Sequence, residues 1–308
     1  MTSVAGVDPA FGGPFRCSAA SQDLAEPLAG SASTVRAFLL VEAPGAWGVD
    51  AVTGSRLPVP VKERLAELAR VHGVRPLMIR GHGRQRTVGT RVFAAFVHTD
   101  RPWMETTVLD DPESLVGLDL DGLASGRSPG LTPYDEPLFL VCTHGRHDAC
   151  CAELGRPLGK AMHEVDPGHT WEVSHIGGDR FAPNVLVLPE GLYYGRLTPD
   201  DAATFVAGHR AGELSLPHLR GRCVFPFAIQ AAEIYLREHL RLRSVAALPL
   251  VSSRRDRDEV QAVFEVDGVR WRVRLRSVRG QPRRLTCRAV SDSGGLEHTL
   301  LGLEQLPA

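Results

Sequence analysis

Apolar and polar positions along the first half of the chain predict one α/β unit. Residues 1–30 are rich in Ala, Ser, Gly and Pro, which predicts an irregular segment. The apolar run Thr34–Glu42 predicts a buried strand, and Val61–His72 places its apolar residues at helical spacing. The remaining predicted elements are strands at Arg75–Arg80, Arg91–His98 and Glu105–Leu109 and a short helix at Asp111–Val116. The predicted order is therefore strand, helix, strand, strand, strand, helix.

The second half of the chain repeats this order. Its predicted elements are a strand at Pro137–Cys142, a helix at Cys151–His163, strands at Thr170–Ser174, Val185–Leu188 and Tyr193–Arg196, and a helix from Thr198 to about Gly208. The last helix begins with a cap residue, a proline and two acids, all favourable at a helix N-terminus. A parallel β-α-β unit followed by a hairpin and a helix is the thioredoxin arrangement. We therefore predict an α/β fold with two thioredoxin-like halves, at residues 31–132 and 133–224.

Residues 225–308 predict a small α+β appendage. Its predicted elements are an amphipathic helix at Phe225–Leu240, a hairpin formed by Asp258–Val266 and Val269–Arg276, and a third strand at Arg284–Val290. The hairpin turns at Asp-Gly, a favoured two-residue turn. Arginines alternate along its second strand, which is typical of a solvated face, although an acidic redox partner or a nucleic acid could also dock there.

The composition describes a globular protein without a strong overall charge. The 308 residues are 43% hydrophobic and 23% charged, as in globular proteins. The net charge is −1, so the chain as a whole has no positive electrostatic field that would attract nucleic acid or an anionic membrane. No apolar run reaches the roughly 18 residues of a membrane span, and the N-terminus lacks a signal-peptide pattern. Six cysteines are too few for a disulfide scaffold, so they are expected to be reduced thiols or ligands in a cytoplasmic protein.

Two motifs carry the candidate chemistry. Cys142 and Cys151 lie nine positions apart, with Cys150 beside the second, and His175 and Asp179 lie four positions apart in SHIGGDRFAPN. Each motif follows one of the two predicted parallel strands, so both loops leave the same edge of the sheet. Soft thiolates and imidazole in two such pairs are typical of an iron–sulfur cluster or of zinc.

The spacing C-x8-C, followed by SHIGGDRFAPN and YYG, resembles the sucrase/ferredoxin-like family, closely from about Leu138 to Arg222 and loosely upstream to about Cys17. The characterised members are thioredoxin-fold [2Fe-2S] ferredoxins, so the resemblance implies an electron carrier with a redox partner protein and no substrate of its own. It implies Cys142 and Cys151 on one iron and two histidines on the other. His175 matches the first histidine, but Asp179 stands at the second.

The fourth ligand is left open by the sequence. The candidates are Asp179, Cys150, Cys223, His144 and His147. Cys150 and Cys223 are also expected as small buried residues, and His144 and His147 as outer-sphere donors or, in preference, surface residues. Gly177 and Gly178 would bring backbone N–H groups close to the cluster, and Arg180 is expected to organise the loop through an ion pair, as are Arg146 and Asp148. Cys17 and Cys287 are expected to be inert.

Two other functions compete with the electron carrier. One is a structural zinc site in an interaction protein, because zinc suits two Cys, one His and one Asp equally well. The other is a thiol-disulfide oxidoreductase, which the sequence disfavours because Cys150 and Cys151 are adjacent and would close only a strained ring. The first half has PGAWG where the second has its cysteines, so it cannot hold a cluster in the same way.

Overall fold

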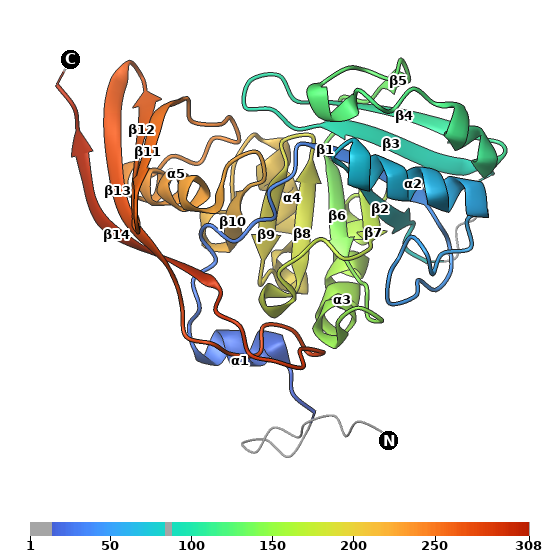
Figure 1. The fold of residues 1–308 in the computed structure, drawn as a ribbon, viewed down its shortest axis with the longest axis horizontal. Helices are drawn as coiled ribbons and strands as arrows, with labels where there is room; N and C mark the ends of the chain where they lie inside the picture. The colour runs from blue at the N-terminus through green and yellow to red at the C-terminus, as the bar shows by residue number, and fades with distance from the viewer. Residues whose placement is uncertain (1–13, 84–87, 308) are drawn as a thin grey trace.

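A single ten-stranded sheet forms the centre of the molecule (Figure 1). The structure, a computed structural model, describes residues 14–83 and 88–307. Along the sheet the strands run in the order β10-β9-β8-β6-β7-β2-β1-β3-β4-β5. Their bounds are β1 (Ala37–Glu42), β2 (Val74–Arg80), β3 (Thr90–Phe96), β4 (Trp103–Leu109), β5 (Thr132–Pro133), β6 (Leu138–Cys142), β7 (Thr170–Val173), β8 (Asn184–Leu188), β9 (Leu192–Gly195) and β10 (Leu219–Arg222).

The sheet contains the predicted repeat. In the first half β1 is parallel to β2 and antiparallel to β3, which pairs with β4. In the second half β6 is parallel to β7 and antiparallel to β8, which pairs with β9. Each half thus has the thioredoxin-like strand order. The two halves join edge to edge through the antiparallel pair β2–β7, where Ile79 faces Val173, so they share one sheet.

Five α-helices and five short 3-10 helices pack around the sheets within the described residues. The α-helices are α1 (Cys17–Asp23), α2 (Val59–Val71), α3 (Ala149–Val165), α4 (Ala202–Arg210) and α5 (Phe227–Leu240). The 3-10 helices are η1 (Pro112–Gly117), η2 (Leu123–Ser125), η3 (Asp179–Phe181), η4 (Pro199–Asp201) and η5 (Leu216–His218). The helix expected from Asp111 is thus the 3-10 helix η1, and α1 forms where an irregular segment was expected.

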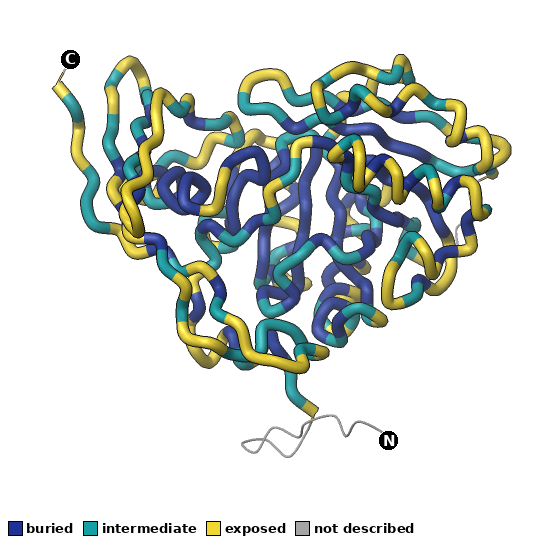
Figure 2. Tube along the Cα trace, viewed as in Figure 1, coloured by how far each residue is buried: buried dark blue, intermediate teal, exposed yellow. Residues whose placement is uncertain are grey.

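Alternation along the strands divides the core between the two faces of the sheet. On one face, α2 packs on the first half through residues such as Leu65, and α3 and α4 pack on the second half through residues such as Leu158 and Phe205. On the other face, α5 packs against apolar residues from both halves. The central strands are buried along their length (Figure 2), so the loops at their ends are held by a rigid support.

The C-terminal part forms a second sheet of four antiparallel strands, in the order β11-β12-β13-β14. They are β11 (Leu250–Asp256), β12 (Glu259–Val266), β13 (Val269–Arg279) and β14 (Leu296–Gln305). The predicted hairpin is present as β12 and β13, and its arginine-bearing strand is partly neutralised, since Arg272 pairs with Glu304 at 2.9 Å. No helix of the described residues is long and apolar enough to cross a membrane.

The third strand predicted at Arg284–Val290 is wrong. This segment runs irregularly between β13 and β14. The backbone N–H of Cys287 donates to Oδ2 of Asp148 at 2.7 Å, and so this part of the segment bonds to the start of α3 instead of to a neighbouring strand.

Candidate metal centre

The two predicted motifs meet at the carboxyl ends of β6 and β7. Cys142 is the last residue of β6, and Cys151 lies in the first turn of α3, which follows it. β7 ends at Val173, and the next loop carries His175 and leads into η3, which begins at Asp179. Because β6 and β7 are parallel neighbours, both loops leave the same edge of the sheet.

Asp179 connects the two pairs of side chains. Its Oδ1 accepts a hydrogen bond from Sγ of Cys151 at 3.2 Å and lies 2.9 Å from Nδ1 of His175. The Asp179 side chain is only 2% exposed, so it points inward. Arg180 turns away and pairs with Glu26 at 2.7 Å, so this arginine holds the loop without neutralising Asp179.

Burial and mutual contact set the protonation of the metal-free site. The hydrogen bond from the Cys151 thiol lowers the pKa of Cys142, and the same contact, together with burial, raises the pKa of Cys151 well above its usual value. Burial alone would raise the pKa of Asp179, but His175 outweighs burial and lowers it. Burial would likewise lower the pKa of His175, and Asp179 reverses this and raises it. The two cysteines thus differ in the ease with which they lose a proton, and Asp179 and His175 favour each other's charged forms.

His144 is a buried residue and not a surface residue, which corrects the preferred expectation for it. It is 2% exposed. Its Nε2 lies 2.7 Å from the carbonyl of Gly48, which can only accept, so Nε2 carries the proton. Nδ1 then accepts from the backbone N–H of His175 at 3.2 Å. Burial lowers the pKa of His144, in agreement with a neutral ring. Both nitrogens are occupied, so His144 orients the loop and leaves no nitrogen to bind a metal.

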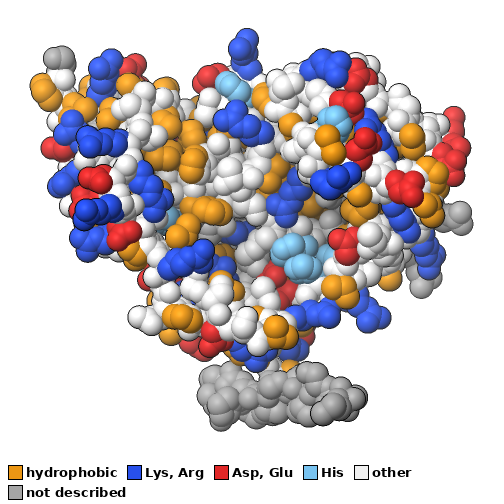
Figure 3. Space-filling model, in the orientation of Figure 1, with side chains coloured by type: hydrophobic (Ala, Val, Ile, Leu, Met, Phe, Trp, Pro, Cys, Tyr) orange, Lys and Arg blue, Asp and Glu red, His pale blue; other side chains and the backbone are white. Residues whose placement is uncertain are grey.

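His147 lies much closer to the site. Its ring stacks on that of His175 with centroids 3.7 Å apart, and its Nε2 lies 3.8 Å from Oδ2 of Asp179. The side chains of His147 and His175 are 35% and 28% exposed, which places them at the surface. A group of histidine side chains is visible in a hollow on the face shown in Figure 3.

The two glycines of the loop are required by its backbone and by what lies behind it. Gly177 and Gly178 have φ values of +99° and +79°, which favour glycine. The Arg220 guanidinium, fully buried, packs behind them and donates to the carbonyl of Gly177 at 2.9 Å and to Oδ1 of Asn184 at 2.8 Å. Asn184 in turn donates to the carbonyl of Gly178 at 2.9 Å. Sequence reasoning gave neither residue a role: Asn184 closes the motif SHIGGDRFAPN without a visible function there, and nothing in the local sequence marks Arg220.

The other cysteines considered as a fourth ligand lie elsewhere. Cys150 turns away from Cys151, and its Sγ contacts Cys17 and Cys287. Cys223 is buried beside Gly191, and burial raises its pKa to about 12, which leaves an unreactive thiol. The adjacent residues Cys150 and Cys151 thus belong to two different groups of side chains.

The donor atoms of the site do not all lie close to one point. A tetrahedral zinc ion needs four donors that surround one point. Among the described residues of this site, ligand atoms of His147, His175 and Asp179 all lie within 4.8 Å of one another, and this group includes neither Cys142 nor Cys151. Cys151 contacts Asp179, but the two cysteines and the His175–Asp179 pair do not all surround a single point. Nδ1 of His175 is buried and lies 2.9 Å from Oδ1 of Asp179, without a hydrogen bond of suitable geometry.

Comparison with known proteins places this site in a family. Residues 28–221, more than half of the chain, match the family described as Sucrase/ferredoxin-like. A curated relative, altered inheritance of mitochondria protein 32 from Meyerozyma guilliermondii, is 31% identical over 81 residues, which cover 23% of this chain and 29% of that protein.

Solved structures of a thioredoxin-like [2Fe-2S] ferredoxin from Aquifex aeolicus are 22% identical to the chain. One covers 30% of this chain and 97% of the ferredoxin with a TM-score of 0.27. Another, of a cysteine-to-serine variant, covers 28% and 100% with a TM-score of 0.25. The family match spans both loops of the site, and the chain belongs to the sucrase/ferredoxin-like family.

Proposed function

We propose that the chain binds one [2Fe-2S] cluster through Cys142, Cys151, His175 and Asp179 and transfers single electrons to a partner protein. The observation that carries this proposal is the arrangement of the donors. Two thiols and a His–Asp pair lie side by side at the ends of two parallel strands, and the Cys151–Asp179 contact links them. When bound, such a cluster accepts and releases one electron.

The residues of the chain would hold this group in a defined position. Cys142 and Cys151 would supply two thiolates from β6 and α3, and the already lowered pKa of Cys142 favours the form that binds metal. His175 and Asp179 would supply one nitrogen and one oxygen. His144, through its bond to the backbone N–H of His175, keeps the second loop in place.

Asp179 distinguishes this chain from the two-histidine pattern that the family resemblance implies. A carboxylate carries one negative charge that an imidazole lacks, so it stabilises the oxidised form of a bound redox centre. Ligation by two Cys, one His and one Asp therefore predicts a lower reduction potential than ligation by two Cys and two His.

The exposed edge of the site would be the place where electrons enter and leave. The side chains of His147 and His175 are partly exposed, whereas Cys142, Cys151 and Asp179 are buried. A redox partner could therefore approach the site from the histidine side, while the thiol side stays protected by the core.

The proposal is tested by anaerobic purification, or by reconstitution, followed by iron and sulfide analysis. We expect two irons and two sulfides per chain and a red-brown colour. Zinc held by Cys142 and Cys151 in place of iron would favour the structural zinc site. Free thiols at these positions with no metal would point to thiol chemistry, and either result would overturn the proposal.

A further inference from the structure

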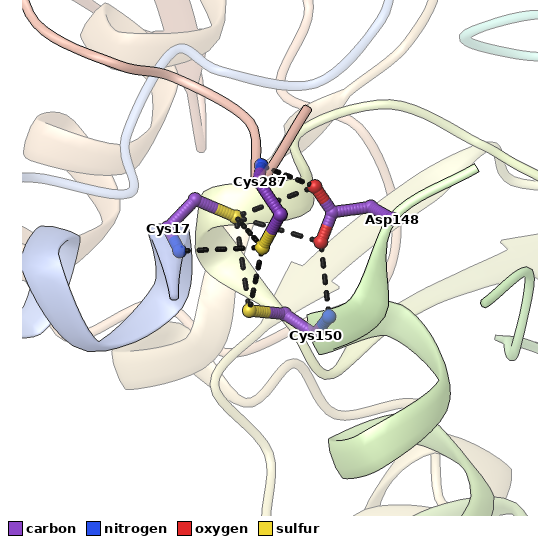
Figure 4. Close-up of side chains that lie close together, drawn as sticks. All are labelled: Cys17, Asp148, Cys150 and Cys287. Atoms are coloured by element: carbon purple, nitrogen blue, oxygen red, sulfur yellow. Dashed lines mark hydrogen bonds between the residues drawn. The ribbon is translucent and has the colours of Figure 1, made fainter. Parts of the chain in front are cut away.

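A second group of metal-binding side chains lies apart from the site described above. It consists of Cys17, Asp148, Cys150 and Cys287, whose ligand atoms lie within 4.8 Å of one another (Figure 4). Cys17 begins α1, Asp148 and Cys150 stand at the start of α3, and Cys287 comes from the irregular segment before β14. The fold therefore brings together three segments that are at least 131 residues apart.

The distances in this group match those between ligands of one tetrahedral ion. The three Sγ atoms are separated by 3.4 Å (Cys150–Cys287), 3.6 Å (Cys17–Cys287) and 3.8 Å (Cys17–Cys150). Two thiolates bound to one zinc at about 2.3 Å and at the tetrahedral angle lie about 3.8 Å apart. The Sγ of Cys17 lies 3.6 Å from both oxygens of Asp148, near the roughly 3.5 Å expected between a sulfur and an oxygen ligand.

A disulfide accounts for the group less well. Its sulfurs would lie about 2.05 Å apart, and any one disulfide would leave the third cysteine unpaired beside it. All three sulfurs are instead nearly equidistant, and Asp148 lies next to them.

The group is also buried without a positive charge. Asp148 is fully buried, Cys17 and Cys150 are 1% exposed, and Cys287 is partly buried. Asp148 accepts backbone hydrogen bonds from Cys150 at 2.9 Å and from Cys287 at 2.7 Å, and no Lys or Arg of the described residues forms an ion pair with it. Burying a carboxylate among three thiols is costly unless a cation compensates them.

Arginines line the surface beside Cys287 on the outer side of the group, without forming an ion pair with Asp148. Three thiolates, one carboxylate and Zn²⁺ sum to −2. Arg284 stacks on Phe15 at 4.2 Å and donates to the carbonyl of Cys287 at 3.0 Å. Arg288 donates to the carbonyl of Arg146 at 2.7 Å, which holds the Cys287 segment against the loop before α3.

We propose that Cys17, Asp148, Cys150 and Cys287 bind one Zn²⁺ ion in a structural site. Four protein ligands close the site, as in structural zinc sites generally, and binding releases three thiol protons. The ion connects α1 and the segment before β14 to the start of α3. This role explains why the residues near Cys287 run irregularly between β13 and β14 and do not pair as a strand. It is independent of the proposed electron carrier, because it uses none of that site's ligands.

The first test measures zinc in the full-length chain, purified under reducing conditions with zinc and desalted. We expect one zinc per chain, counted separately from any iron and sulfide. X-ray absorption at the zinc edge should show three sulfurs at about 2.3 Å and one oxygen at about 2.0–2.2 Å. This measurement needs no variant, so it decides the question even if variants fail to fold. Absence of stoichiometric zinc, iron in this three-sulfur site, or a disulfide between two of these cysteines would overturn the proposal.

The second test compares variants in a competition with a chromophoric zinc chelator. Cys17→Ser and Cys287→Ser should each weaken zinc binding at least tenfold and leave iron and sulfide content unchanged. Cys223→Ser is the matched control, since it removes a buried thiol elsewhere. Asp148→Asn can keep the helix cap while it removes the anion, so it should also weaken zinc binding. Wild-type zinc affinity in both cysteine variants would place the ion elsewhere and refute the site.

Discussion

Replacing Gly178 by alanine is expected to destabilise the loop that carries His175 and Asp179. Gly178 has φ +79°, and a Cβ there would overlap Nη2 of the buried Arg220. Alanine in the left-handed region costs about 1–2 kcal/mol. The larger effect comes from Arg220, whose guanidinium must move to make room for the new methyl group.

The cost of moving Arg220 follows from its hydrogen bonds. It donates to the carbonyls of Gly177 (2.9 Å) and Ser31 (2.6 Å), to Oδ1 of Asn184 (2.8 Å) and to Oγ of Ser31 (3.2 Å). Losing one or two hydrogen bonds from a charged donor costs about 1.5–3 kcal/mol each. Taken with the backbone cost, Gly178→Ala should lower the free energy of unfolding by about 2.5–8 kcal/mol, a large part of the roughly 5–15 kcal/mol of an ordinary domain.

Urea unfolding of the reduced, metal-free protein measures this effect. Gly130→Ala is the first control, because Gly130 has φ +75° with nothing within 4 Å of a new Cβ, so it should lose only about 1–2 kcal/mol. Gly117 has neither a positive φ nor any atom within 4 Å of a new Cβ, so Gly117→Ala should leave the free energy of unfolding nearly unchanged. If Gly178→Ala loses no more than Gly130→Ala, then Arg220 does not hold the loop and this reasoning is refuted.

Three further predictions concern the ligands and the pH dependence of stability. Cys142→Ser and Cys151→Ser should each abolish cluster binding, because a hard hydroxyl replaces a soft thiolate. Cys150→Ser should keep the cluster. Iron and sulfide analysis that finds the cluster lost in Cys150→Ser and kept in Cys151→Ser would identify Cys150 as the ligand instead. Asp179→His should retain the cluster and raise its potential, measured by redox titration, and a lowered potential would contradict aspartate ligation. For Glu26, burial raises the pKa, but the ion pairs with Arg180 and Arg283 together outweigh burial and lower the pKa overall. The contribution of Glu26 to stability is therefore present above its unfolded pKa and lost as the pH falls through the lower folded value. Glu26→Gln should make the free energy of unfolding depend less on pH in this acidic range. An unchanged pH dependence would show that the ionisation of Glu26 is not linked to stability.

Periodic patterns predicted most of the fold because they report local burial. The strand order of both halves and the hairpin at Asp267–Gly268 follow from such patterns. The pairing of β2 with β7 does not, since two strand edges meet only in three dimensions. The strand expected at Arg284–Val290 failed for a related reason: the segment turns between Thr286 and Ala289, and Cys287 bonds to the distant Asp148, which the local pattern does not reveal.

The candidate site was predictable as far as its residues form motifs. Cys142, Cys151, His175 and Asp179 stand at motif spacing and meet in space. The support from Arg220 was not predictable, because it reaches the loop from a distant strand without a local signature. The same limit hid the meeting of Cys17, Cys150 and Cys287, which the sequence alone presents as unrelated cysteines.

Pulsed EPR of the reduced protein, labelled with ¹⁵N-histidine, tests the proposed ligand set most directly. Ligation by Cys142, Cys151, His175 and Asp179 predicts strong coupling to one histidine nitrogen, and Asp179→His should add a second. His147, stacked on His175, is the nearest alternative ligand. Two strongly coupled nitrogens from separate histidines in the wild-type protein would contradict aspartate ligation and assign the fourth position to His147.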